Sequence, residues 1–257
     1  MTFVLTFVVV LAACVLLREP LRRYPAVFYT LAVVAVVAQL ASAPLGLPKS
    51  VDLALLLLVK RCNVAMALFA VVMFIGALSP DSRAGSWMRP VRSEISIVAC
   101  ILCAGHVVGY VAWYVPRVFA GALANPFVAV GLVAALVLTV LLVLLGVTSV
   151  QRVKRAMGSV KWRRIQRLAY LFFVLACMHA LLMLMPSALG GGAAAVEGAL
   201  AYGVLLVAYL VLRGVRLLAD RHLGKAPEET RPLDEPNRRP AQAPAVESSE
   251  ECKEDVS

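Results

Sequence analysis

The sequence predicts an all-α protein, a polytopic membrane helical bundle of about seven spans followed by a disordered tail. Of its 257 residues, 61% are hydrophobic and 16% are charged, whereas soluble domains are about half apolar with roughly 25% charged residues. The mean hydropathy is +0.86. Apolar runs of about 20 residues, the length that crosses a bilayer as a helix, recur along most of the chain.

The apolar runs predict spans in order along the chain. The first basic residue, Arg18, follows the first run, which favours a retained helix over a cleaved signal peptide. Lys60, Arg61 and Asn63 interrupt the third run, so we expect its outer part to lie near the membrane interface. The seven predicted spans are residues 2–17, 26–43, 51–78, 93–115, 126–148, 165–185 and 198–218.

Charge divides the chain and predicts its orientation. The net charge is +10, and residues 226–257 hold nine acidic and four basic residues, so the remainder carries +15. The basic residues gather after spans one, three, five and seven, which by the positive-inside rule places the amino terminus outside a plasma membrane and the carboxyl terminus in the cytoplasm. We expect three regions: an extra helix and basic loop (1–25), the main bundle (26–225) and a disordered acidic tail (226–257).

Two histidines stand at matched depth in the predicted bundle. His106 lies 14 residues after Arg92, and His179 lies 15 residues after Arg164. At ~1.5 Å per residue both imidazoles are about 21–23 Å from the inner boundary. Ionisable residues at such depth are costly and usually face a partner or a cavity. The pair is therefore a candidate metal site, with both imidazoles as axial ligands of one b-type haem; the alternative is that each imidazole only hydrogen-bonds its neighbours.

Further residues are candidates around this pair. Tyr110 follows His106 by four residues and shares its helix face. Arg61 is placed to pair with the haem propionates, or else to extend toward the outer interface. The six cysteines are interpreted as packing residues rather than a disulfide framework, because five of them lie in or beside apolar segments.

One spaced motif consists of Thr148, Ser149, Gly158, Trp162, Tyr170 and His179, and an earlier one ends in His106 and Tyr110. With these motifs, residues 64–218 resemble the ferric reductase-like transmembrane domain family, and within it the haem-bearing MsrQ-type membrane subunits. The resemblance implies a six-helix haem bundle, with the first span as an addition. It also implies that electrons pass from a cytoplasmic flavin reductase or membrane quinol, through haem, to an outer acceptor.

This chain departs from the family pattern at three places. Ser96 replaces a glycine, and one extra residue separates Gly158 from Trp162. Gln166 stands where the family has its inner-side histidine, and a carboxamide is a poor iron ligand compared with imidazole. Thirteen residues turn an ideal helix by about 220°, so Gln166 and His179 do not share a face. We therefore expect one haem rather than two.

The sequence thus favours a membrane b-type cytochrome that relays electrons through one haem to an extracytoplasmic reductase or metal acceptor. It would act as an electron-transfer subunit of an oxidoreductase, embedded in the lipid bilayer without a catalytic domain of its own. The alternative is a haem-free scaffold or anchor subunit that binds a partner protein, with the acidic tail as docking segment. The basic residues match membrane loops and do not indicate a nucleic-acid partner.

Overall fold

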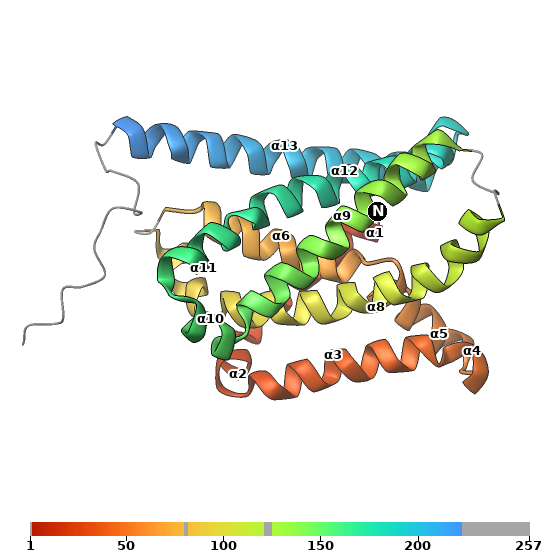
Figure 1. Ribbon diagram of the computed structural model, residues 1–257, viewed down its shortest axis with the longest axis horizontal. Coiled ribbons are helices and arrows are strands. Elements are labelled where there is room, and N and C mark those ends of the chain that lie inside the picture. The colour runs from red at the N-terminus through yellow and green to blue at the C-terminus, as the bar shows by residue number, and fades with distance from the viewer. Residues whose placement is uncertain (1, 80–81, 121–124, 223–257) are drawn as a thin grey trace, which may run out of the picture.

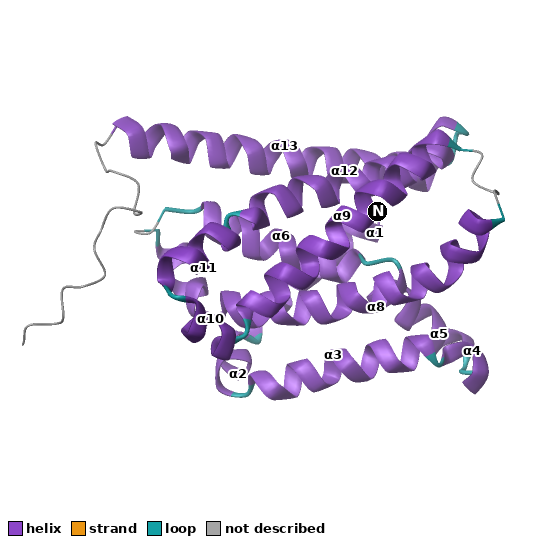
Figure 2. Ribbon diagram, in the orientation of Figure 1, coloured by secondary structure: helices purple, strands orange, loops and turns teal. Residues whose placement is uncertain are grey.

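The computed structural model describes residues 2–79, 82–120 and 125–222, and every element within these ranges is a helix (Figures 1 and 2). This confirms the predicted all-α bundle. The acidic tail predicted at residues 226–257 lies outside the described residues.

Each predicted span coincides with a long helix or a group of consecutive helices. Five are long and apolar enough to cross a membrane, whereas the first two are shorter apolar helices. The spans are α1 (Thr2–Leu16), α3 (Pro25–Leu40), the segment of α5 (Lys49–Leu55), η1 (Leu56–Lys60) and α6 (Asn63–Ala77), then α8 (Arg92–Phe119), α9 (Pro126–Ser149), α12 (Leu168–Leu189) and α13 (Ala193–His222).

Short helices join the spans. One of them, α11 (Ser159–Gln166), continues into α12 through Arg167, whose backbone is itself helical and whose amide donates to the Arg163 carbonyl at 3.1 Å. The others are α2 (Arg18–Arg23), α4 (Ser42–Leu45), α7 (Arg83–Met88), η2 (Arg89–Val91) and α10 (Gln151–Met157).

The third span is interrupted where the sequence predicted. The π-helical turn η1 ends at Lys60, and the chain leaves helical structure at Arg61 and Cys62 before α6 begins. Cys62 has a φ of 58°, which among the described residues other than glycine is the one positive φ. Residues other than glycine rarely adopt this conformation. The break therefore stores some backbone strain, and it divides a predicted span into two short helices.

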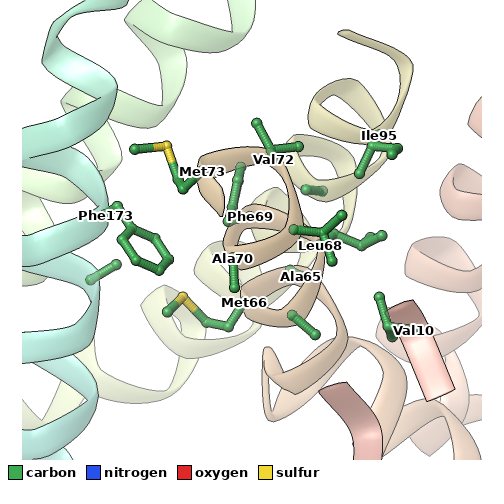
Figure 3. Packing of buried hydrophobic residues seen from close by; sticks show 14 of the residues in the cluster. Val10, Ala65, Met66, Leu68, Phe69, Ala70, Val72, Met73, Ile95 and Phe173 are labelled. Carbon is green, nitrogen blue, oxygen red and sulfur yellow. The ribbon is translucent and has the colours of Figure 1, made fainter. Parts of the chain in front are cut away.

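Helix α6 forms the centre of the bundle. Eleven of its fifteen residues are buried, and it packs against α1, α8, α12 and α13. In Figure 3, Met66 and Met73 lie on the side of Phe173, whereas Leu68 lies on the side of Ile95. A helix that is apolar all round must be covered on all sides, and the surrounding spans provide that cover.

The outer helices present apolar side chains to the surroundings. Helices α3 and α13 lie at opposite edges of the bundle in Figure 1. On α13, large exposed aliphatic residues recur every three or four positions, which makes one continuous apolar stripe along the helix. Such a face suits contact with lipid rather than water, as expected of a multi-pass membrane protein. The stripe consists of Leu200, Val204, Val207, Val211, Val215 and Leu218.

Candidate functional site

His106 lies on α8 and is oriented by a backbone carbonyl. Its Nδ1 is 2.7 Å from the carbonyl oxygen of Lys60. A carbonyl oxygen can only accept, so Nδ1 must carry the proton and donate it in this bond. The neutral ring then keeps its lone pair on Nε2. His106 therefore presents an unprotonated nitrogen of the kind that binds a metal.

The helix break explains why the Lys60 carbonyl is available. In a regular α-helix that carbonyl would accept from the amide four residues later, but Val64 already belongs to α6, beyond the break. The preceding turn is closed by other bonds: the Arg61 amide donates to the Leu56 carbonyl at 2.9 Å, and the Cys62 amide donates to the Val59 carbonyl at 3.0 Å. The break thus leaves one carbonyl for the imidazole.

A glycine brings the neighbouring elements close to His106. A Cβ atom at Gly105 would lie 2.7 Å from a methyl group of Val36 on α3 and 2.8 Å from one of Val59 on η1. Both neighbours are β-branched and stiff at χ1, and Val59 is fully buried. Gly105 therefore permits α3, η1 and α8 to meet beside the histidine.

His179 lies on α12 and is oriented in the same chemical manner from a different element. Its Nδ1 is 2.9 Å from the carbonyl oxygen of Gly131 on α9. Nδ1 again donates, and Nε2 keeps its lone pair. A Cβ atom at Gly131 would lie 2.6 Å from the terminal methyl of Met183 on α12. The glycine thus lets α9 and α12 approach closely enough for the carbonyl to reach the ring.

The two imidazoles belong to one neighbourhood. They are near enough to interact electrostatically, although α8 and α12 take other helices as their main packing partners. Both α8 and α12 pack against α6 and α9, which hold them in place. The donor set is two half-buried neutral imidazoles whose tautomers leave both Nε2 atoms free, and this fits the axial ligation of a haem iron. In the part of the chain that the structure describes, there is no cluster of three or more His, Cys, Asp or Glu residues that could hold a metal ion.

The two further candidates lie on the His106 side. The ring centroids of Tyr110 and His106 are 4.7 Å apart with an interplanar angle of 47°, so they share a helix face as predicted from their spacing. Arg61 is exposed at the break and interacts electrostatically with Tyr110. The structure thus brings Arg61, Tyr110 and His106 together, while His179 lies on a different helix, α12.

At the other end of the bundle, Gln166 takes part in a polar network that joins α11 to α9. Its Nε2 donates to Oγ1 of Thr148 at 3.2 Å, and Nε1 of Trp162 donates to the Thr148 carbonyl at 3.0 Å. The hydroxyl of Thr148, which is only 2% exposed, donates to the Leu144 carbonyl at 2.8 Å. Trp162 and Gln166 therefore connect α11 to Thr148 on α9.

Sequence reasoning did not identify three features of the site. The two carbonyl partners of the histidines come from the backbone, which any residue type supplies. In the sequence, only the interrupted apolar run at Lys60 and the presence of glycine at position 131 marked where these carbonyls lie. The third feature is a contact of 3.9 Å between the sulfurs of Cys62 and Cys103, two cysteines that the sequence suggested were packing residues. All described cysteines are free, consistent with the absence of a disulfide framework among them.

These observations define a class: a multi-pass helical membrane protein with two imidazoles oriented by backbone carbonyls. Residues 61–177 match the family described as "Ferric reductase like transmembrane component", which confirms the predicted resemblance to the ferric reductase-like family. The matched range contains His106 and ends two residues before His179.

One curated relative has a comparable sequence. An uncharacterized protein of Treponema pallidum (strain Nichols) is 38% identical over 132 residues, which cover 51% of this chain and 36% of that protein. The aligned part is thus about a third of the relative's length. No solved structure matches the chain.

Proposed function

We propose that this protein is a membrane electron-transfer subunit that holds one b-type haem between His106 and His179. A ferric reductase-like transmembrane region suggests the broad role. The observation that supports the cofactor is the matched pair of hydrogen bonds, 2.7 Å and 2.9 Å, in which each Nδ1 donates to a backbone carbonyl and leaves Nε2 free.

The chain's own residues would bind, orient and shield the group. When bound, haem supplies one-electron redox chemistry at its iron. His106 and His179 would hold the haem iron through their Nε2 atoms. Hydrogen bonds from the second ring nitrogen fix the orientation of a ligating histidine and raise its basicity, which is the part played by the carbonyls of Lys60 and Gly131. The buried side chains of α6 keep the interior of the bundle apolar.

Arg61 and Tyr110 would position the edge of the group. Arg61 is a permanent cation at the exposed helix break, and it suits the haem propionates. Tyr110 packs against the His106 ring and limits its rotation. These roles need no side chain beyond those that the structure already brings together.

The proposed direction of electron flow rests on the family resemblance and on the distribution of basic residues. A cytoplasmic flavin reductase or a membrane quinol would be the donor, and an extracytoplasmic reductase or metal acceptor would receive the electrons. The proposed orientation has the amino terminus outside and the carboxyl terminus in the cytoplasm of a plasma membrane. In this role the chain contributes ligation, burial and orientation, and its partners carry out the substrate chemistry.

Gln166 supports one haem rather than two. Its amide nitrogen already donates to Thr148, and its remaining oxygen is a weak ligand for iron compared with an imidazole nitrogen. The inner end of the bundle therefore has a polar network between helices where a second axial imidazole would be needed.

The test is the haem content of the full chain, purified in detergent after expression with adequate haem supply. We expect one haem per chain, a Soret band that shifts on reduction, and a low-spin ferric signal in electron paramagnetic resonance. His106→Ala and His179→Ala should each abolish the low-spin signal, whereas His222→Ala, which changes the third histidine of the chain, should retain it.

Other outcomes would contradict the proposal in distinct ways. A chain that folds but binds no haem would overturn it and favour the haem-free scaffold, which a partner-binding assay with a tail deletion would then examine. Two haems per chain would overturn the one-haem assignment and require an inner ligand other than Gln166.

A further inference from the structure

A pair of thiols lies beside the hydrogen bond that joins His106 to the Lys60 carbonyl, and it has no part in the proposed haem site. The sulfur of Cys62, at the helix break, is 3.9 Å from the sulfur of Cys103 on α8. The two cysteines are 41 positions apart in sequence, so the fold rather than local chain geometry brings them together. Both are half-buried.

The position of Cys62 distinguishes this pair from packing cysteines. Cys14 and Cys177 are buried among apolar residues, which is typical of inert thiols. Cys62 instead follows two exposed basic residues, Lys60 and Arg61, where the chain has left helical structure. The thiol pair is therefore next to an exposed, cationic part of the surface.

We propose that Cys62 and Cys103 form a redox-active dithiol that closes reversibly to a disulfide by exchange with a disulfide-bonded partner. The Cys62 thiolate attacks one sulfur of the partner disulfide, forming a mixed disulfide and releasing the first partner thiolate. Cys103 then attacks the Cys62 sulfur and releases the second partner thiolate. The two cysteines lose two electrons and two protons in all, and the partner gains both as two thiols.

The small distance between the sulfurs makes this closure accessible. Sulfurs at 3.9 Å are in van der Waals contact, and a disulfide brings them to about 2.05 Å. Cys62 lies at the helix break and Cys103 lies on α8. Forming the disulfide therefore requires rotation of the two side chains and a small shift of the break. Cys62 lies between η1 and α6, outside both helices, and the break is therefore suited to that shift.

Closure would affect the histidine anchor directly. Cys103 precedes His106 by three residues, so both lie on one face of α8. Cys62 follows Lys60, whose carbonyl accepts the Nδ1 hydrogen bond of His106, by two residues. The disulfide would thus join covalently the two elements that this hydrogen bond connects. The dithiol state leaves them held by non-covalent contacts alone.

The experiment uses the full chain in lipid nanodiscs, in a Cys252→Ser background that removes the cysteine of the tail. The protein is treated with glutathione disulfide or with diamide, a membrane-permeant reagent that takes two electrons and two protons from a dithiol. Free thiols are then blocked with N-ethylmaleimide in denaturant, disulfides are reduced, and the released thiols are labelled with iodoacetamide for peptide mass spectrometry.

We expect Cys62 and Cys103 to acquire the second label together, and dithiothreitol treatment before blocking to reverse this. Cys62→Ser should prevent labelling of Cys103, and Cys103→Ser should leave Cys62 with a bound glutathione. Cys100→Ser, a matched change one helical turn from Cys103, should leave the paired labelling intact.

Two results would overturn the inference. In one, both thiols keep the first label under conditions that oxidise an exposed reference dithiol peptide, which would make them packing residues. In the other, Cys103 still acquires the second label in Cys62→Ser after treatment with diamide alone, which would assign its partner to another cysteine. Since the readout is the state of the thiols, it is independent of haem content.

Discussion

His106 and His179 each donate a hydrogen bond from Nδ1 to a backbone carbonyl, but the two carbonyls become available in different ways. We call each histidine with its carbonyl partner a histidine anchor. On the His106 side, a break in the third span frees a carbonyl, and stiff valines pack around Gly105. On the His179 side, the carbonyl belongs to Gly131, within the continuous helix α9, and the nearest side chain is the flexible end of Met183. One anchor is irregular backbone in tight packing, and the other is regular backbone with room to adjust.

This difference shows two routes by which an apolar bundle can orient an imidazole. A helix interior offers carbonyls that already accept a backbone amide, so the ring must use the second lone pair. A helix break offers a carbonyl with no amide of its own, at the cost of strain elsewhere. The first route tolerates change in its surroundings, whereas the second depends on the local conformation being preserved.

The largest expected difference between the anchors follows from adding a single methyl group to each glycine. Gly105→Ala should be less stable than Gly131→Ala by about 1–3 kcal/mol, because overpacking against rigid neighbours has that cost while Met183 can rotate away. The gain in helix propensity, about 1 kcal/mol for alanine over glycine, is common to both and cancels. Unfolding midpoints in mixed micelles measure the difference, and equal values would contradict the contrast between rigid and adaptable packing.

The strained residue at the break gives the next largest effect. With a φ of 58°, Cys62 should prefer glycine, and Cys62→Gly should be more stable than Cys62→Ala by about 1–2 kcal/mol. Cys62→Val should be the least stable of the three, since β-branched residues tolerate positive φ poorly. The same series removes the thiol in every member, so the thiol contact does not affect the ranking. An inverted order would show that the break relaxes to a regular helix.

The smallest expected effect concerns the hydrogen bonds of Trp162 and Gln166 with Thr148. It tests whether this network is independent of the two histidines. Gln166→Ala removes the hydrogen bond to Thr148, and a typical bond of this kind contributes about 0.5–1.5 kcal/mol. We expect a loss of stability in that range with no change in haem content or in the low-spin signal. Gln166→Glu serves as the matched variant of equal size, and a loss of haem in either would join the inner network to the site.

Much of the fold could be predicted from the sequence because lipid imposes a length on every apolar run. The interruption at Lys60 and Arg61 was also predictable, since charged residues are costly inside an apolar helix. Helix geometry predicted that Gln166 and His179 do not share a face, and their hydrogen-bond partners differ: Thr148 for Gln166 and the Gly131 carbonyl for His179.

Only part of the candidate site could be predicted from the sequence. Residue type identifies His106 and His179, and spacing identifies Tyr110. The partners of the imidazoles are backbone carbonyls, whose availability depends on hydrogen bonds made elsewhere in the chain. The contact of Cys62 with Cys103 likewise depends on how α6 meets α8, which no local pattern encodes.

The shortness of α6 has a consequence for how the protein is inserted into its membrane. At ~1.5 Å per residue its fifteen residues extend about 22 Å, less than the roughly 30 Å of a hydrocarbon core. The preceding charged break would be drawn into lipid if α6 had to span alone. Surrounded by α1, α8, α12 and α13, it never meets lipid over most of its surface. We therefore expect its stable insertion to require spans synthesised after it as well as before it.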